Sequence, residues 1–143
     1  MARLDKADGT QTNSITWTMG HVATGWLFDH ALMTGERFQF GERAFFGPGA
    51  DPTPPTFEEM RAMFAKAKAL TEKWLPGATD ELLSSKRDFG PQASENLGTQ
   101  LMRAVLHTWF HIGEINATRQ MLGHPEIQFV GRMVGRLEYG GAA

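Results

Sequence analysis

The sequence of 143 residues contains no cysteine, and this absence removes several kinds of chemistry at once. Disulfide bonds, thiolate metal ligands and a cysteine nucleophile are all excluded. Any metal ion must therefore be held by nitrogen or oxygen atoms.

Long hydrophobic runs and blocks of basic charge are lacking as well. No apolar run reaches the roughly 18 residues that a membrane-spanning helix requires, and Met1 to Thr10 lack the apolar core of a secretory signal. The formal net charge is -2 with no basic block, so the electrostatic footprint of a nucleic-acid-binding protein is missing. We therefore expect a soluble, cytoplasmic protein that binds neither membranes nor nucleic acid.

The chain length bounds the organisation. With 143 residues and 41% hydrophobic residues, the chain suffices for one hydrophobic core and is short for two. No internal repeat is visible, so residues 1–143 are expected to form a single domain.

What the sequence does contain is three stretches with helix signals. The first should begin near Thr12 to Ser14, where capping residues precede an apolar run, and end at Thr34 before Gly35. The second opens at Thr56 with Glu59 three residues later, which is a capping-box pattern, and ends at Pro76-Gly77.

The third helix should start between Ser94 and Thr99 and run to Leu122. Its apolar groups from Leu106 to Ile115 occupy nearly every side, a pattern that predicts a buried helix. A further short helix within Glu126 to Tyr139 is weakened by two glycines. Three helices leave a core incompletely covered, so a fourth partner is expected from the tail, from upstream residues or from a second copy.

The first two helices are separated by a long connection, Gly35 to Pro55, rich in glycine and proline. Its roughly 20 residues span on the order of 60 Å when extended, more than the roughly 33 Å of a 22-residue helix. The second helix can therefore run parallel to the first. Within the connection, Phe45 and Phe46 are interpreted as residues that tie it to the core, in preference to a pocket rim.

The histidines suggest a metal site. His107 and His111 are four residues apart on the third helix, so both imidazoles leave the same face, and Glu114 continues that stripe. Thr108 stands where the zinc-protease motif His-Glu-x-x-His requires its glutamate, which disfavours that mechanism of peptide hydrolysis. The spacing also fits two core histidines that each donate one hydrogen bond. Glu114 is read equally as a second-shell acceptor, fourth ligand or general base, or as a partner of Arg103 or Arg119.

A third ligand must come from another helix, and His21 is the better candidate because Gly20 and Gly25 leave room for an ion. His30, near the end of the first helix, is expected to be solvated or to interact with the helix dipole. His124 follows a stop glycine and precedes proline, so it is expected in a loop.

Four segments read together resemble the DinB-like (DinB/YfiT) family. They are Asn13-Ser14-Ile15 to Trp17, Gly20-His21-Val22-Ala23, the run from His107 to Glu114, and Arg119 to Pro125. The resemblance spans Asn13 to Val130, and its specificity lies in pairing the early Trp-x-x-x-His with the late His-x-x-x-His-x-Gly.

The resemblance implies an all-α, DinB-like four-helix bundle with a long crossover and a divalent metal ion held by three histidines. Carried over by position, the ligands are His21, His107 and His111. The ion would be zinc, nickel or iron, which all suit imidazole. Family members carry a complete helix before the Asn-Ser-Ile segment, and here only about a dozen mostly polar residues precede it. The chain is therefore expected to be truncated there or to fill the gap with another element, and homodimers are a common answer in similar proteins.

The family includes thiol-dependent transferases, maleylpyruvate isomerase and a domain of sulfoxide synthases. The leading hypothesis is a metal-dependent enzyme, a thiol S-transferase or hydrolase, that directs a low-molecular-weight thiol or water at a small electrophilic substrate. Glu114 would orient a ligand or accept a proton. The alternatives are a non-catalytic metal-binding or ligand-binding bundle that acts in stress response, and a purely structural helical subunit in which the histidines do not converge.

Overall fold

The computed structural model describes residues 4–36, 46–47, 53, 55–87 and 95–128. Four α-helices lie within these ranges: α1 (Ile15–Thr34), α2 (Phe57–Trp74), the short α3 (Asp80–Ser84) and α4 (Leu97–Met121). A 3-10 turn, η1 (Leu75–Gly77), follows α2, and the described residues contain no strand beyond isolated bridges. The all-α class predicted from the sequence is confirmed.

The capping residues account for the ends of α1 and α2. The Ser14 hydroxyl accepts a hydrogen bond from the Trp17 amide at 3.2 Å, and Gly35 ends α1 with a φ of 76°, a conformation that favours glycine. Thr56 and Glu59 form the predicted capping box at the start of α2. Both helices therefore lie where the sequence predicted them.

The predicted third helix corresponds to α4. Its N-cap is Asn96, whose side-chain oxygen accepts from the Thr99 amide at 2.8 Å, and Gly123 follows its end with a φ of 79°. The short helix α3, which lies between η1 and α4, was not predicted from the sequence. Its signal was present in the sequence, because Thr79 is an N-cap whose hydroxyl accepts from the Leu82 amide, and Asp80 and Glu81 lie in the first helical turn.

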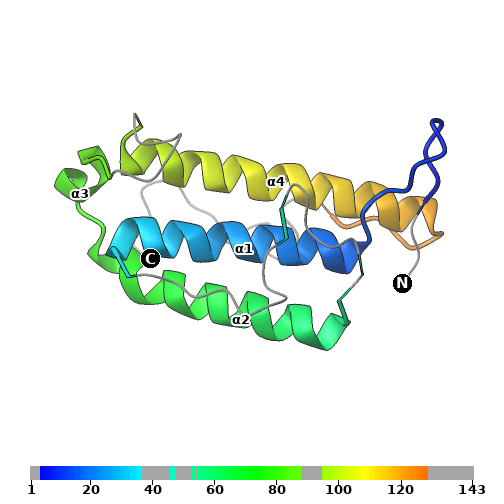
Figure 1. The fold of residues 1–143 in the computed structure, drawn as a ribbon, viewed down its shortest axis with the longest axis horizontal. Helices are drawn as coiled ribbons and strands as arrows, with labels where there is room; N and C mark the ends of the chain where they lie inside the picture. Colours follow the sequence, from blue (N-terminus) through cyan, green and yellow to red (C-terminus); the bar gives the residue numbers. More distant parts are fainter. Residues whose placement is uncertain (1–3, 37–45, 48–52, 54, 88–94, 129–143) are drawn as a thin grey trace.

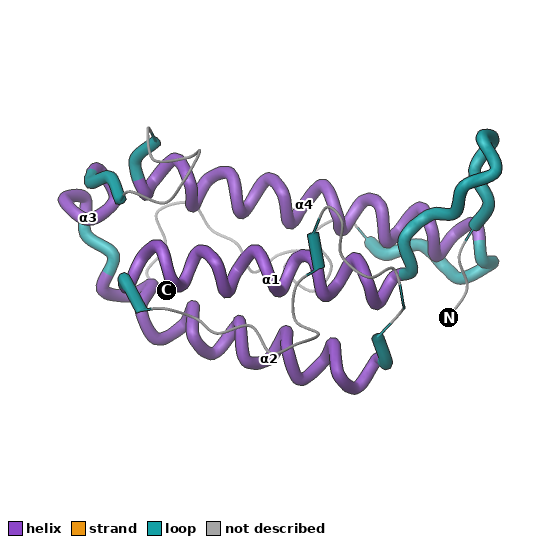
Figure 2. The backbone as a smooth tube through the Cα atoms, in the orientation of Figure 1, coloured by secondary structure: helices purple, strands orange, loops and turns teal. Residues whose placement is uncertain are grey.

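The three long helices lie side by side, with α1 between α2 and α4 (Figure 1). The chain colours show that α1 and α2 run in the same direction and that α4 runs in the opposite one. The parallel course of α2, which the long crossover allows, is thus observed. The tube in Figure 2 places α3 beside the start of α4, which it contacts.

The core is centred on α1. One cluster joins Ala23 and Leu27 of α1 to Ala67 of α2, and a second joins Leu32 and Met33 of α1 to Leu97 of α4. A helix with partners on both sides buries most of its residues, including polar ones, and α1 does so.

The prediction that α4 is buried all round is wrong. Met102 is 66% exposed, Leu106 is 64% exposed and Phe110 is 71% exposed. The helix packs against α1 along one side and presents an apolar face to solvent along another. The sequence places apolar residues on nearly every side of this helix. How many of those sides pack against another helix depends on the fold and cannot be read from the sequence of the helix alone.

Two further predictions concern the ends of the chain and the membrane. Residues 126–128 of the suggested tail helix are not helical, and the rest of that segment lies outside the described residues. None of the helices in the described ranges is long and apolar enough to cross a membrane.

Candidate metal centre

The structure brings His21, His107 and His111 together between α1 and α4. The Nε2 atom of His107 lies 3.0 Å from Nε2 of His21 and 3.0 Å from Nε2 of His111. All three imidazoles are half-buried, and their ring centroids are 4.5 to 4.8 Å apart. Residues 86 positions apart in the sequence thus form one compact cluster.

The distances between the Nε2 atoms fit one metal ion shared by the three imidazoles. Two ligand nitrogens at about 2.0 to 2.1 Å from a tetrahedral zinc ion are about 3.3 to 3.4 Å from each other. The two Nε2 distances of 3.0 Å require only a small outward adjustment to reach that value. The histidine group could therefore hold a metal ion through Nε2 atoms alone.

His21 is held in the tautomer that a metal ligand needs. Its Nδ1–H donates to the backbone carbonyl of Phe46, so the lone pair is left on Nε2. The Trp17 ring stacks on the His21 ring with a centroid separation of 5.6 Å and an interplanar angle of 13°. A hydrogen bond on one side and an indole on the other fix the ring orientation.

Phe46 reaches His21 because position 20 is glycine. A Cβ atom at Gly20 would lie 2.7 Å from Cδ2 of Phe46 and 2.7 Å from Sδ of Met60, closer than real side chains pack. The sequence suggested that Gly20 leaves room for an ion, but the space beside Gly20 is filled by the side chains of Phe46 and Met60. Phe46 is buried and ties the connection to the core, as predicted. The hydrogen bond between its carbonyl and His21 was not predicted. Phe45 lies outside the described residues.

Glu114 orients the His111 ring. Its Oε2 atom accepts a hydrogen bond from Nδ1–H of His111 at 2.7 Å, which leaves Nε2 of His111 directed at the cluster. Arg103, one of the alternative partners, instead pairs with Glu95. Among the roles left open, the geometry favours an acceptor that holds the His111 ring in place from its Nδ1 side.

The environment of His107 favours its neutral form, because its pKa is lowered. Burial lowers its pKa first, and the neighbouring charges of His111 and His21 lower it further. Neutral imidazole is the form that binds metal. A Cβ atom at Gly25 would lie 3.9 Å from Nδ1 of His107, an ordinary van der Waals distance, so the small residue is not required there.

The remaining histidines do not join the cluster. His124 lies in the loop after α4, as predicted. The prediction of a solvated His30 is wrong: its exposed fraction is 4%, and Nε2 lies 3.2 Å from Oε2 of Glu36. It is buried because α1 has neighbours on both sides almost to its end.

Comparison with known proteins identifies a family. No curated protein and no solved structure matches the chain. A family model described as the DinB superfamily matches residues 2–115, a segment that contains all three histidines and Glu114.

Proposed function

This chain belongs to the DinB superfamily, and from that membership and the histidine cluster we propose that it is a metal-dependent enzyme acting on a small electrophile. His21, His107 and His111 are the proposed ligands of one divalent cation. The observation that carries the proposal is the convergence of three Nε2 atoms, two of them with the opposite ring nitrogen already donating a hydrogen bond.

The donor set favours catalysis over storage. Three nitrogen ligands leave a position of a four-coordinate ion open to water or substrate. Glu114 supports this arrangement, since its carboxylate is engaged with Nδ1 of His111 on the side away from the cluster. A bound cation would lower the pKa of a thiol or water ligand and thereby supply a nucleophile near neutral pH.

The nucleophile we propose is a low-molecular-weight thiol, with water as the hydrolytic alternative. Because the chain has no cysteine, the sulfur comes from a small molecule. In the transfer, the thiol would release its proton to solvent, its sulfur would form a bond to the electrophilic carbon, and the leaving group would depart with its bonding electrons. The three histidines would hold the cation, and the carboxylate of Glu114 would stabilise the positive charge that a bound cation places on the His111 ring.

The first test is elemental analysis of untagged protein and its His111→Ala variant, with His124→Ala as the matched control outside the cluster. We expect about one equivalent of metal in the parent and in the control, and a loss in His111→Ala. No metal in any of the three after reconstitution with zinc or nickel would refute the centre.

The second test separates enzyme from carrier. Metal-loaded parent should consume a small thiol and an alkyl halide together, releasing halide, and the His111→Ala protein should not. If the metal-loaded parent turns over none of a panel of thiols and also does not hydrolyse the electrophile with water, the enzyme proposal is refuted. The function would then be that of a non-catalytic metal-binding bundle.

We also propose that a second copy covers the exposed face of α4. Residues 104–113 contain no Asp, Glu, Lys or Arg, so the face suits an uncharged partner, and a two-fold axis would pack it against itself. Half the surface of a cylinder of about 5 Å radius and about 37 Å length is roughly 600 Å². Specific interfaces bury at least roughly 600 Å² per partner, so the proposed contact runs along the whole length of α4, beyond the uncharged residues 104–113.

A further inference from the structure

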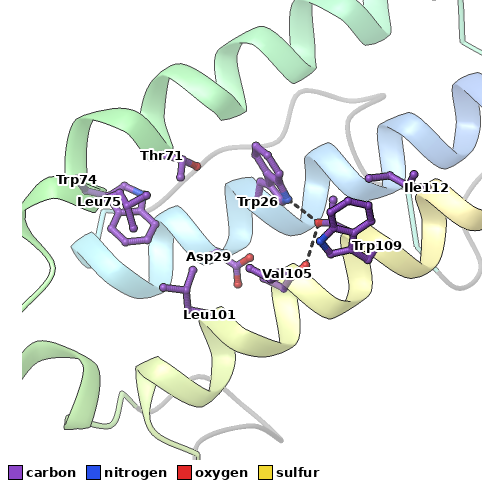
Figure 3. A pocket seen from close by; sticks show the side chains of 11 residues that line it. Trp26, Asp29, Thr71, Trp74, Leu75, Leu101, Val105, Trp109 and Ile112 are labelled. Atoms are coloured by element: carbon purple, nitrogen blue, oxygen red, sulfur yellow. Dashed lines mark hydrogen bonds between the residues drawn. The ribbon is translucent and has the colours of Figure 1, made fainter. Parts of the chain in front are cut away.

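A cavity of about 360 Å³ lies between α1, α2 and α4, apart from the histidine cluster (Figure 3). None of the three clustered histidines lines it. Its volume falls within the roughly 300 to 1,000 Å³ of small-molecule sites. The walls are almost entirely apolar, with Leu101 and Val105 contributed by α4.

Asp29 is the charged residue of this wall. It is 9% exposed, and Figure 3 shows its carboxyl group between α1 and α4 at the cavity. Burial raises its pKa to about 7. Within the described part of the chain, no hydrogen bond or ion pair joins Asp29 to another residue. A carboxyl group buried among apolar side chains without a partner is costly, and a cation supplied from outside would relieve that cost.

Three of the four tryptophans in the sequence also line the cavity: Trp26, Trp74 and Trp109. Indole faces attract organic cations while excluding water. The Nε1–H of Trp26 donates to the hydroxyl of Thr108 at 2.9 Å. The Nε1 atom of Trp74 is buried and has no hydrogen-bond partner within the described residues, so a donor is available as well.

We propose that this cavity binds a hydrophobic organic cation, whose apolar body packs against the three indoles and whose ammonium group pairs with the Asp29 carboxylate. An anionic molecule is disfavoured because the cavity already holds a carboxylate and no described cationic side chain lines it. The site is independent of the metal centre, so the two proposals can fail separately.

The test is titration of metal-free protein at about pH 8, where Asp29 is ionised. The probes are 2-phenylethylamine and its neutral analogue 2-phenylethanol. Calorimetry gives the affinity, and tryptophan fluorescence reports occupancy because three indoles surround the cavity. Parent protein should bind the amine more tightly than the alcohol.

Asp29→Asn should weaken amine binding roughly 10- to 100-fold, as expected for loss of a charged hydrogen-bond partner, and leave alcohol binding unchanged. Asp80→Asn, at an exposed position in α3, should alter neither. Equal amine affinity in the parent and Asp29→Asn would overturn the proposal, as would no amine binding at millimolar concentrations. Because Asp29→Asn removes a buried charge, it is expected to fold, which circular dichroism checks.

Discussion

The buried carboxyl of Asp29 allows a quantitative prediction about stability. Burial raises its pKa from the ordinary 3.8 to about 7 in the folded protein, a difference of about 3 pH units. Each unit corresponds to about 1.36 kcal/mol, so ionising Asp29 in the fold costs on the order of 4 kcal/mol. Replacing Asp29 by Asn keeps the shape and removes the charge.

The sign follows from proton binding. Because the folded-state pKa is raised, the native state binds the proton more tightly than the unfolded state between about pH 4 and pH 7. Stability therefore falls as pH rises through this window, and the full cost applies above it. Asp29→Asn should be more stable than the parent by up to about 4 kcal/mol at about pH 8 and close to it at about pH 4.

Urea unfolding of the metal-free proteins at several pH values measures the difference. Subtracting the two curves isolates Asp29, because all other titratable groups are the same in the two proteins. Asp80→Asn, on an exposed carboxylate, should show no such pH dependence. If the difference between parent and Asp29→Asn is the same at about pH 5 and about pH 8, the carboxyl does not titrate in this range and the burial argument is wrong.

Three further predictions concern the metal centre and the exposed helix face. Gly20→Ala should destabilise the fold by about 1 to 3 kcal/mol and weaken zinc binding, because the new methyl group displaces Phe46. Gly25→Ala has room for its Cβ atom and should do neither. Thermal melting and zinc titration of the two variants measure both effects. Glu114→Gln should lower zinc affinity about 10- to 100-fold in a competition assay, and unchanged affinity would contradict its role in orienting His111. Phe110→Glu should convert a dimer to a monomer in sedimentation, and a parent that already sediments as a monomer would exclude the proposed interface.

Local sequence signals predicted the helices because helix ends are decided locally. Ser14, Thr56 and Asn96 each accept a hydrogen bond from an amide three residues later, and such contacts depend on nearest neighbours only. The five-residue α3 carries the same kind of signal at Thr79 and was missed because the sequence analysis looked for longer periodic segments.

Long-range features were harder to predict. The spacing of His107 and His111 placed them on one face, but the sequence offered His21 only as the better of the remaining candidates, and the family resemblance was needed to pair it with them. The Phe46 carbonyl could not be foreseen, since it meets His21 only when the Phe46 side chain packs over Gly20. The exposed side of α4 has a similar cause: hydropathy describes what a helix face prefers, and packing decides whether it has a partner.

The wide separation of the ligands in sequence bears on how the protein would acquire its metal during folding. His107 and His111 are one turn apart, so an ion can engage both as soon as that part of α4 is helical. Engaging His21 as well closes a loop of 86 residues, which costs an unfolded chain about 4 kcal/mol in entropy. Metal uptake during refolding should therefore occur in two kinetic phases, a fast capture by two histidines and a slower completion limited by the docking of α1 against α4. Metal present from the start would complete its coordination only after the native topology has formed. It should therefore slow the unfolding of the protein more than it speeds the folding.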